Sequence, residues 1–398
     1  MAAGKGPSLV LLLLAVFGAM SLWFVSAAIL PGMNAEFPIS PFRQAALSSA
    51  VQLGFVVGAL ISAILGIADR HDPRRLLGIC AVLAGVVNLT LLASTPGSAA
   101  AIAARGLTGA LLAGVYPVGM KIAVGWGEKD RGFIVGSFVG ALILGSAAPH
   151  LFALSGGTDW RPTVVIASVV AIAGGLLAQM VGLGPHHAQS KRFDPRAVVT
   201  AWTNRRVRLA YAGYFGHMWE LYAMWAWIAV IAALSYGAHM SEERAVTLAA
   251  ITAFVSIAAG AVTSMIAGRR ADRIGKASVA LAAMVVSGVC AVLTALTFGG
   301  PVWLTFTVIV LWGASISPDS AQFSALVADN APADQAGSLM TLQTALGFAL
   351  TFVTVQATPV LAAWWGWPAV MAIMALGPLF GIVAMARLNA MGVPARNP

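Results

Sequence analysis

Long apolar runs separated by short polar segments make up most of the 398-residue chain. The hydrocarbon core of a bilayer, about 30 Å thick, needs roughly 20 apolar residues per spanning helix, so runs of that length predict membrane spans. The first run is longer than the core of a secretory signal and no small-residue cleavage site closes it, so we expect a retained span. We count twelve runs, near residues 9–32, 45–67, 76–95, 99–123, 131–154, 162–184, 209–236, 245–267, 277–298, 302–327, 337–362 and 368–387.

The longest polar interruption runs from Pro185 to Arg208 and divides the apolar runs into six and six. We therefore predict an all-α membrane protein with three parts. An N-terminal six-helix bundle is expected over residues 1–184, a cytoplasmic linker over 185–208 and a C-terminal six-helix bundle over 209–398.

A short charged segment occurs twice, each time between the second and third runs of its group. Residues 65–75 read LGIADRHDPRR, and residues 268–276 read GRRADRIGK. Such matches in register predict an internal duplication, and transporters with parallel repeats bind their substrates at the repeat interface near the midplane. Further matches, 198 to 206 positions apart, pair Phe17-Gly18 with Phe215-Gly216, Tyr116-Pro117 with Ser317-Pro318, and Pro162 with Pro368.

Composition excludes an ordinary soluble protein, because 9% of the residues are charged and 59% are hydrophobic. The net charge of +9 does not indicate nucleic-acid binding, since the basic residues follow the membrane sides. We count 19 of the 23 Lys and Arg on the side of the N-terminus and three on the opposite side. This bias predicts cytoplasmic termini in an inner membrane. Cys80 and Cys290 lie in apolar runs and indicate neither a disulfide framework nor a metal site.

These features resemble the major facilitator superfamily, whose signature between helices 2 and 3 is Gly-x-x-x-Asp-Arg-x-Gly-x-Arg-Arg. Leu65 and Asp72 replace its two glycines. A further family feature, an Arg early in helix 4 followed by small residues, is matched by Arg105 and Gly109. The signature residues that match are Asp69, Arg70, Arg74 and Arg75. The copy in the second half keeps Gly268, Asp272, Arg273 and Gly275.

The resemblance implies two pseudo-symmetric bundles that rock about a central cavity lined by helices 1, 4, 7 and 10. It implies a monomer that takes a small-molecule substrate, works in the lipid bilayer and needs no cofactor. The runs 9–32 and 99–123 are also faintly similar to the nitrate/nitrite and cyanate-like branch. That branch's nitrate carriers place an Arg in helix 2 and another in helix 8, and here neither run has one, so nitrate is not carried over.

Ionisable side chains deep in an apolar run need an explanation, because a charge at the bilayer centre costs about 2.5–3.5 kcal/mol on insertion scales. Glu220 lies eleven residues into the run 209–236, and His217 precedes it by three residues, on the same helical face. Burial disfavours a charged carboxylate, so Glu220 is the leading candidate proton carrier, with His217 or Asp319 as its partner. A purely structural buried pair would give the same pattern.

Aromatic residues fill the same run, which holds four of the chain's five tyrosines. A belt at the membrane surface is the alternative interpretation, but belts occupy the ends of spans and this cluster runs through the middle. We therefore expect substrate contacts from Tyr214, Trp219 and Tyr222.

Asp319 follows Pro318 in the polar sequence SISPDSAQ of residues 315–322. A proline frees a backbone carbonyl, which membrane helices tolerate where polar side chains or water can pair with it. We therefore expect a bent, hydrated segment. Through the resemblance, Glu220 and Asp319 would lie on neighbouring walls of the cavity.

Arg105 lies about six residues below the surface opposite the termini. It could reach that surface with its long side chain, or it could face the cavity and pair with an anion or a carboxylate. The weaker candidates for the cavity wall are Gln52, Tyr116, Gln322, Gln343 and Gln356.

The charged turns suggest latches. Basic side chains of one half can meet acidic loops of the other when the cytoplasmic side closes, and we hypothesise that such contacts favour an outward-open state. The basic turns supply Asp69, Arg70, Arg74, Arg75, Asp272 and Arg273, and the acidic loops supply Glu128, Asp130, Asp329 and Asp334.

No phosphate-binding loop, metal cluster or catalytic triad is visible in the sequence, so ATP-driven pumping and catalysis have little support. We expect a secondary transporter, proton-coupled, that moves a small polar or anionic solute by alternating access. The alternative is a proton-coupled exporter of amphipathic compounds, which would use the aromatic wall of the run 209–236. A solute receptor without transport is the less favoured third hypothesis.

Overall fold

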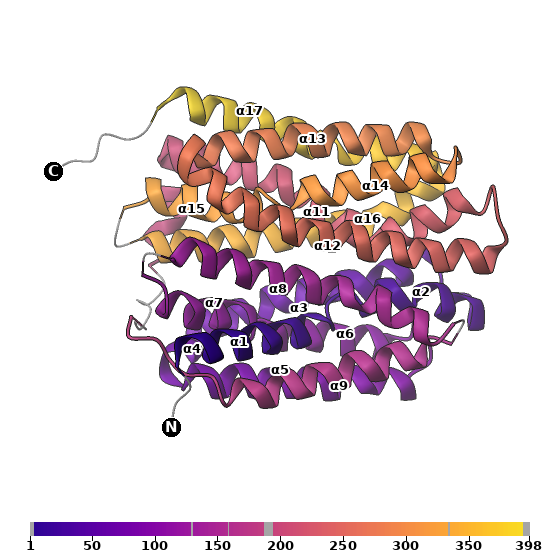
Figure 1. The fold of residues 1–398 in the computed structure, drawn as a ribbon, viewed down its shortest axis with the longest axis horizontal. Coiled ribbons are helices and arrows are strands. Elements are labelled where there is room, and N and C mark those ends of the chain that lie inside the picture. The colour runs from indigo at the N-terminus through magenta and orange to yellow at the C-terminus, as the bar shows by residue number, and fades with distance from the viewer. Residues whose placement is uncertain (1–3, 129, 158, 187–193, 333–334, 393–398) are drawn as a thin grey trace.

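The computed structural model describes residues 4–128, 130–157, 159–186, 194–332 and 335–392, except for the side chains at positions 68, 69, 131 and 272. Helices dominate this part of the chain and lie in two groups, drawn in indigo to magenta and in pink to yellow (Figure 1). The N-terminal group consists of α1 (Lys5–Met20), α2 (Val25–Glu36), α3 (Pro41–Leu65), α4 (Ile67–Arg70), α5 (Pro73–Leu89), α6 (Ala99–Leu112), α7 (Tyr116–Gly125), α8 (Arg131–Phe152) and α9 (Arg161–Ala178).

A short helix, α10 (Arg196–Thr203), leads into the second group. We call the two groups the N-terminal half and the C-terminal half. The C-terminal half consists of α11 (Arg205–Tyr236), α12 (Glu242–Ile274), α13 (Lys276–Thr297), α14 (Val302–Ile316), α15 (Ser320–Asn330), α16 (Ala336–Met374) and α17 (Leu376–Ala390).

Eleven segments of the described chain are long and apolar enough to cross a membrane, and the last of them covers two crossings. That segment, Ala336–Ala390, has 55 residues, about 80 Å of helix at 1.5 Å per residue, against a hydrocarbon core of about 30 Å. Gly366 interrupts it with a φ of 80° and a ψ of 160°, a backbone conformation that glycine adopts without a steric penalty. The prediction of an all-helical fold with twelve spans is confirmed.

Three of the crossings are broken in the middle. The first consists of α1 and α2 with a turn over residues 21–24, the fourth of α6 and α7, and the tenth of α14 and α15. Pro318 lies in the break of the tenth crossing, as its missing N–H predicts. The seventh crossing, α11, is a single unbroken helix of 32 residues.

Glycines let helices of the same half approach each other through their backbones. Gly18 of α1 lies against the carbonyl of Val170 in α9, and a side chain there would overlap it. Gly216 of α11 lies in the same way against the carbonyl of Gly377 in α17. Gly18 and Gly216 belong to the Phe-Gly pairs matched in the sequence, so the duplicated glycines do the same packing in each half.

The two halves meet along two pairs of helices, α3 with α16 and α8 with α12. The start of α1 and the end of α17 lie at one end of the molecule, which we call the linker side, and the opposite end is the distal side (Figure 1). On the distal side, within the N-terminal half, Arg161 donates two hydrogen bonds to Glu36 at 2.7 and 2.9 Å, and the indole of Trp160 donates a third.

We expect Gly54→Ala to destabilise the protein. The methyl group would overlap the carbonyl of Gly106 where α3 and α6 touch, and overpacking of this kind costs about 1–3 kcal/mol. Gly268→Ala is the matched control, because no atom lies within 4 Å of the added carbon in α12. Thermal unfolding of the purified protein in detergent should show a lower midpoint for Gly54→Ala only. Equal midpoints for the two variants would contradict the close contact.

The Glu36 contacts predict that the stability of the protein depends on pH. Hydrogen bonds from Arg161 and Trp160 hold the pKa of Glu36 below its usual range. The stabilisation is therefore complete above the ordinary glutamate pKa of about 4.3 and is lost as the pH falls through the lowered value. Glu36→Gln should lower the thermal midpoint at pH 7, and this difference from the parent should disappear in acid. Glu242→Gln is the control, and a difference that persists in acid would contradict the assignment.

Candidate functional site

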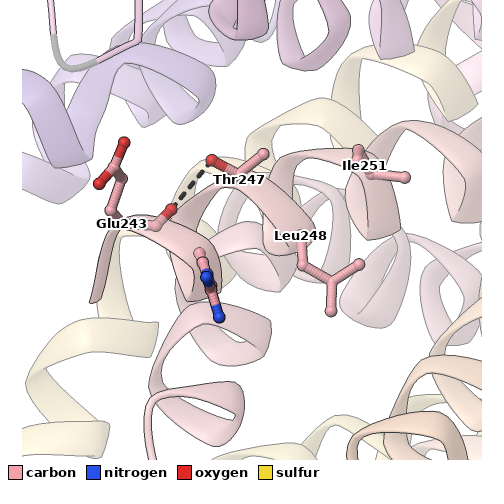
Figure 2. A pocket seen from close by; sticks show the side chains of 5 residues that line it. Glu243, Thr247, Leu248 and Ile251 are labelled. Atoms are coloured by element: carbon pink, nitrogen blue, oxygen red, sulfur yellow. Dashed lines mark hydrogen bonds between the residues drawn. The ribbon is translucent and has the colours of Figure 1, made fainter. Parts of the chain in front are cut away.

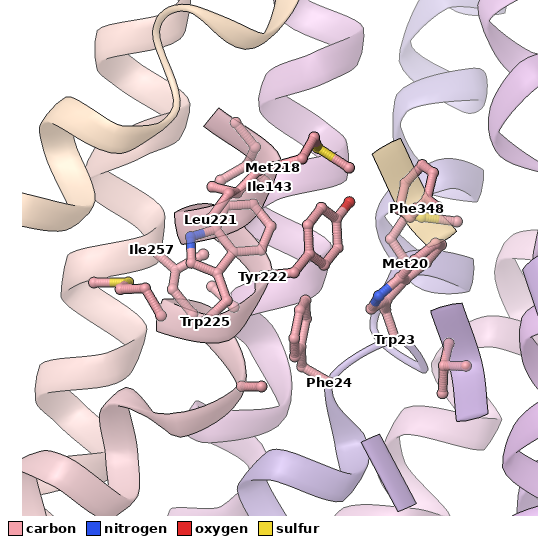
Figure 3. Packing of buried hydrophobic residues seen from close by; sticks show 14 of the residues in the cluster. Met20, Trp23, Phe24, Ile143, Met218, Leu221, Tyr222, Trp225, Ile257 and Phe348 are labelled. Atoms are coloured by element: carbon pink, nitrogen blue, oxygen red, sulfur yellow. The ribbon is translucent and has the colours of Figure 1, made fainter. Parts of the chain in front are cut away.

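The residues predicted on α11 lie on two different faces of this helix. Tyr222 and Met218 point toward the N-terminal half, as Figure 3 shows, where Tyr222 lies near Trp23 and Phe24. Glu220 is two residues, or about 200°, from Tyr222 on the helix and faces the other way. The predicted substrate contact Tyr222 and the buried carboxylate of Glu220 therefore lie on different sides of the same helix.

A layer of aromatic rings fills the space between the halves (Figure 3). Trp23 lies 5.4 Å from Phe348 of α16 and 5.8 Å from Tyr222, measured between ring centroids. Phe55 of α3 lies 4.6 Å from Phe348, and Phe24 stacks with Tyr222 at 5.8 Å. Tilted and stacked rings at such distances attract each other beyond their burial. Apart from Tyr222, these residues were not predicted from the sequence as part of a site, because isolated aromatic residues in apolar runs give no distinct signal.

Three tyrosine hydroxyls make no hydrogen bond within the described part of the chain: those of Tyr116, Tyr214 and Tyr222. Tyr214 packs against Gly347 of α16, and its ring lies 6.2 Å from that of His217. Tyr214 and Tyr222 each keep 7% of their surface exposed, and neither hydroxyl is sealed from solvent. By contrast, the Tyr211 hydroxyl donates to the Leu339 carbonyl. The free hydroxyls are available to a solute or to water.

Glu220 lies inside the C-terminal half with 1% of its surface exposed. The indole N–H of Trp312 in α14 donates to one carboxylate oxygen, and the Ser287 hydroxyl of α13 donates to the other at 3.1 Å. We expected Glu220 on the cavity wall, whereas the structure surrounds it with α13 and α14. Ser287 and Trp312 were not predicted, because only the fold brings them to α11.

His217 and Asp319 form a second buried group in the C-terminal half. The His217 Nδ1 lies 2.9 Å from the Asp319 Oδ1, and the Ser320 hydroxyl lies 2.8 Å from the Nε2. Both side chains of the pair are at most 3% exposed. The break before α15 places Asp319 and Ser320 opposite α11, so the predicted bend in this crossing builds the pair. The Ser317 hydroxyl, in the same break, is buried without a partner among the described residues.

Arg105 is fully buried within the N-terminal half. Its Nη2 donates to the carbonyls of Leu22 and Trp23 at 2.8 Å each, and its Nη1 donates to the Asn88 side chain at 2.9 Å. These carbonyls lie in the break between α1 and α2. Neither option from the sequence, reaching the surface or offering donors to a solute, describes this position, in which the guanidinium pairs with freed backbone groups.

The other predicted wall residues are scattered. Trp219 donates to the Ile373 carbonyl at 3.2 Å, inside the C-terminal half. Gln52 is buried, with its amide beside the Ser48 and Ser49 carbonyls. Gln322 is 4% exposed. Gln343 is fully buried, and neither its amide oxygen nor its nitrogen has a partner in the described chain.

The turn residues show contacts within each half. Arg74 pairs with Asp72 of the same turn at 2.6 Å, and this contact lowers the pKa of Asp72. Lys5 pairs with Asp130 at 2.8 Å. Arg70, Arg75 and Arg273 have no ion pair among the described side chains.

The predicted latch across the halves is therefore not formed by these described residues. Lys276 pairs with Asp329 inside the C-terminal half. The side chains of Asp69 and Asp272, and all of Asp334, lie outside the described residues.

No group of three or more His, Cys, Asp or Glu that could hold a metal ion occurs among the described residues. A shallow hollow lies at the distal end of α12, lined by Glu243, Arg244, Thr247, Leu248 and Ile251 (Figure 2). It belongs to one helix and is separate from the aromatic layer, so it is not the candidate site.

Comparison with known proteins agrees with the fold. The structure resembles the crystal structure of a mutant of the nucleoside transporter NupG, with a TM-score of 0.72 over 96% of this chain and 99% of the other. The two sequences are 13% identical, so this likeness concerns the fold alone. No curated protein sequence matches the chain.

The sequence profile of the Major Facilitator Superfamily matches residues 11–352 and, a second time, residues 235–397. Neither comparison indicates the nitrate/nitrite branch. The matches cover nearly the whole chain and agree with the twelve crossings and with the repeated charged turn. The chain belongs to the Major Facilitator Superfamily and is a secondary transporter of the membrane, not an enzyme.

Proposed function

We propose that the protein is a proton-coupled transporter of a small, polar, uncharged solute that binds between the halves against α11. The observation that carries this proposal is the arrangement on α11 described above. The free hydroxyl of Tyr222 lies toward the interface, and Tyr214, whose hydroxyl is also free, lies beside the buried His217–Asp319 pair.

The side chains at the interface favour a polar solute with a flat face. Tyrosine hydroxyls donate and accept hydrogen bonds, and the rings of Trp23, Phe24 and Phe348 offer surfaces for stacking. Pockets that combine aromatic walls with a few polar groups are typical of small-molecule sites. Arg105 was the expected anion partner, but its guanidinium donates to the α1–α2 break, so we propose an uncharged rather than an anionic solute.

The buried ionisable groups favour coupling to protons. An imidazole beside a carboxylate is a common unit for proton transfer, and the Asp319 carboxylate lies 2.9 Å from the His217 ring. A change of charge there acts on Tyr214, whose ring lies 6.2 Å from His217, and so on a solute beside it. Glu220, one turn along the helix, is the second proposed proton carrier.

We also propose the orientation in the membrane. By sequence, the segments on the side of the N-terminus carry 19 Lys and Arg and the segments on the opposite side carry three, so we assign the side of the N-terminus to the cytoplasm and the membrane to the inner membrane.

An exporter of amphipathic compounds is the second candidate, favoured by the same aromatic layer between the halves. A thermal-shift screen separates the two candidates. Uncharged polar solutes, organic anions and hydrophobic cations would each be added to the purified protein. Stabilisation by the first group supports our proposal, and stabilisation by hydrophobic cations alone overturns it in favour of the second candidate.

Tyr222→Phe should weaken binding of the solute found in that screen by roughly 3- to 10-fold. This is the loss expected for one hydrogen bond of about 0.5–1.5 kcal/mol when the ring is kept. Calorimetric titration measures the effect. Tyr236→Phe is the matched control, because its hydroxyl contacts Thr252 inside the C-terminal half. Unchanged affinity in Tyr222→Phe would remove this hydroxyl from the site.

Asp319→Asn should abolish the response of transport to a pH gradient and keep solute exchange. Asparagine can still accept from the imidazole, but it cannot hold a charge opposite His217. Proteoliposomes with an imposed pH gradient would be compared with liposomes that only exchange labelled solute, and Glu220→Gln would be tested in the same way. Asp159→Asn is the control, since its carboxylate is exposed on the distal side. If both variants accumulate solute as the parent does, neither group carries the proton.

A further inference from the structure

One residue, Gln356 of α16, makes both hydrogen bonds that join the two halves in the described part of the chain. The Ser49 hydroxyl of α3 donates to its amide oxygen at 2.7 Å. Its amide nitrogen donates to the backbone carbonyl of Phe42, at the start of α3, at 3.0 Å. A backbone carbonyl can only accept, so the orientation of this amide is fixed by chemistry.

The contact lies on the distal side of the aromatic layer. Gln356 is eight residues beyond Phe348 along α16, and Ser49 is six residues from Phe55 along α3. At 1.5 Å per residue, Ser49 and Gln356 lie about 9–12 Å along their helices from the ring contact between Phe55 and Phe348. The helices α3 and α16 are therefore in contact at two depths in the membrane: through the rings of Phe55 and Phe348, and through the amide of Gln356.

An amide suits a contact that must form and break in each transport cycle. It satisfies both of its polar atoms when the halves meet, and water can satisfy them when the halves separate. A buried ion pair at this place would cost much more to rearrange, because its charges must be desolvated in each closure. Serine and a backbone carbonyl as partners keep the contact neutral.

We propose that Gln356 is the positioning residue of a distal gate: it fixes α16 to α3, on the distal side of the aromatic layer, whenever the site is closed on that side. Loss of the amide contact shifts the protein toward the state that is open on the distal side. This role concerns the transport cycle and does not depend on which solute is carried or on coupling to protons.

Distances between spin labels on the distal side test the proposal. Labels would be placed with Arg43→Cys on α3 and Trp364→Cys on α16, both exposed, after Cys80→Ala and Cys290→Ala. Gln356→Leu should raise the ratio of long to short distances on the order of tenfold, because two hydrogen bonds of about 0.5–1.5 kcal/mol each are lost. Ser49→Ala removes one of them and should give a smaller rise.

Val353→Leu is the matched control on the same helix, since this side chain is 53% exposed and one turn from Gln356. Its distance distribution should equal that of the parent. Thermal unfolding midpoints should stay close to the parent in all variants, because a gate residue acts on the balance of states and not on the fold. Distributions like the parent's in both Gln356→Leu and Ser49→Ala would overturn the proposal, and Ser49→Ala decides alone if the leucine variant does not fold.

Discussion

A break in a membrane helix leaves backbone carbonyls without partners, and hydrocarbon offers none. This constraint explains why Arg105 lies where it does. Its donors reach the carbonyls of Leu22 and Trp23, which the turn between α1 and α2 has freed. The cost of burying a guanidinium is offset by pairing three groups that would otherwise be unsatisfied. The bent first crossing, in turn, brings Trp23 and Phe24 to the partner half. The aromatic contact between the halves therefore depends on a charge buried within one of them.

The two halves share the same helix packing and differ in the polar side chains that they bury. Gly18 and Gly216 make equivalent backbone contacts, so each half is a tightly packed body. Among the described side chains, the N-terminal half buries the cation of Arg105, which serves the backbone. The C-terminal half buries Glu220 and the His217–Asp319 pair, each bonded to side chains of neighbouring helices. The proposed proton carriers therefore all belong to the C-terminal half, and the aromatic layer joins that half to the other.

The fold could be predicted from the sequence because its signals are local. Run length gave the crossings, the charged turn gave the duplication, and Pro318 marked the break of the tenth crossing. The site was predicted less well, because the direction in which a side chain points depends on how its helix is rotated against the neighbouring helices. Glu220 and Tyr222 are two residues apart and point in opposite directions, which no pattern in a mostly apolar run reveals. Nor does the sequence show that Trp312 and Ser287 meet Glu220, or that residues 21–24 leave the helix without a proline.

The layer of rings between the halves has a consequence for the environment in which the protein works. Ring contacts carry no net charge, whereas ion pairs are screened by dissolved electrolytes. An interface made of such contacts is therefore equally strong at low and at high salt concentration. A change in bilayer thickness is accommodated by helix tilt instead, and a different tilt of α3 or α16 would move these rings relative to one another. Membrane thickness, more than salt concentration, would then affect how readily the two halves separate.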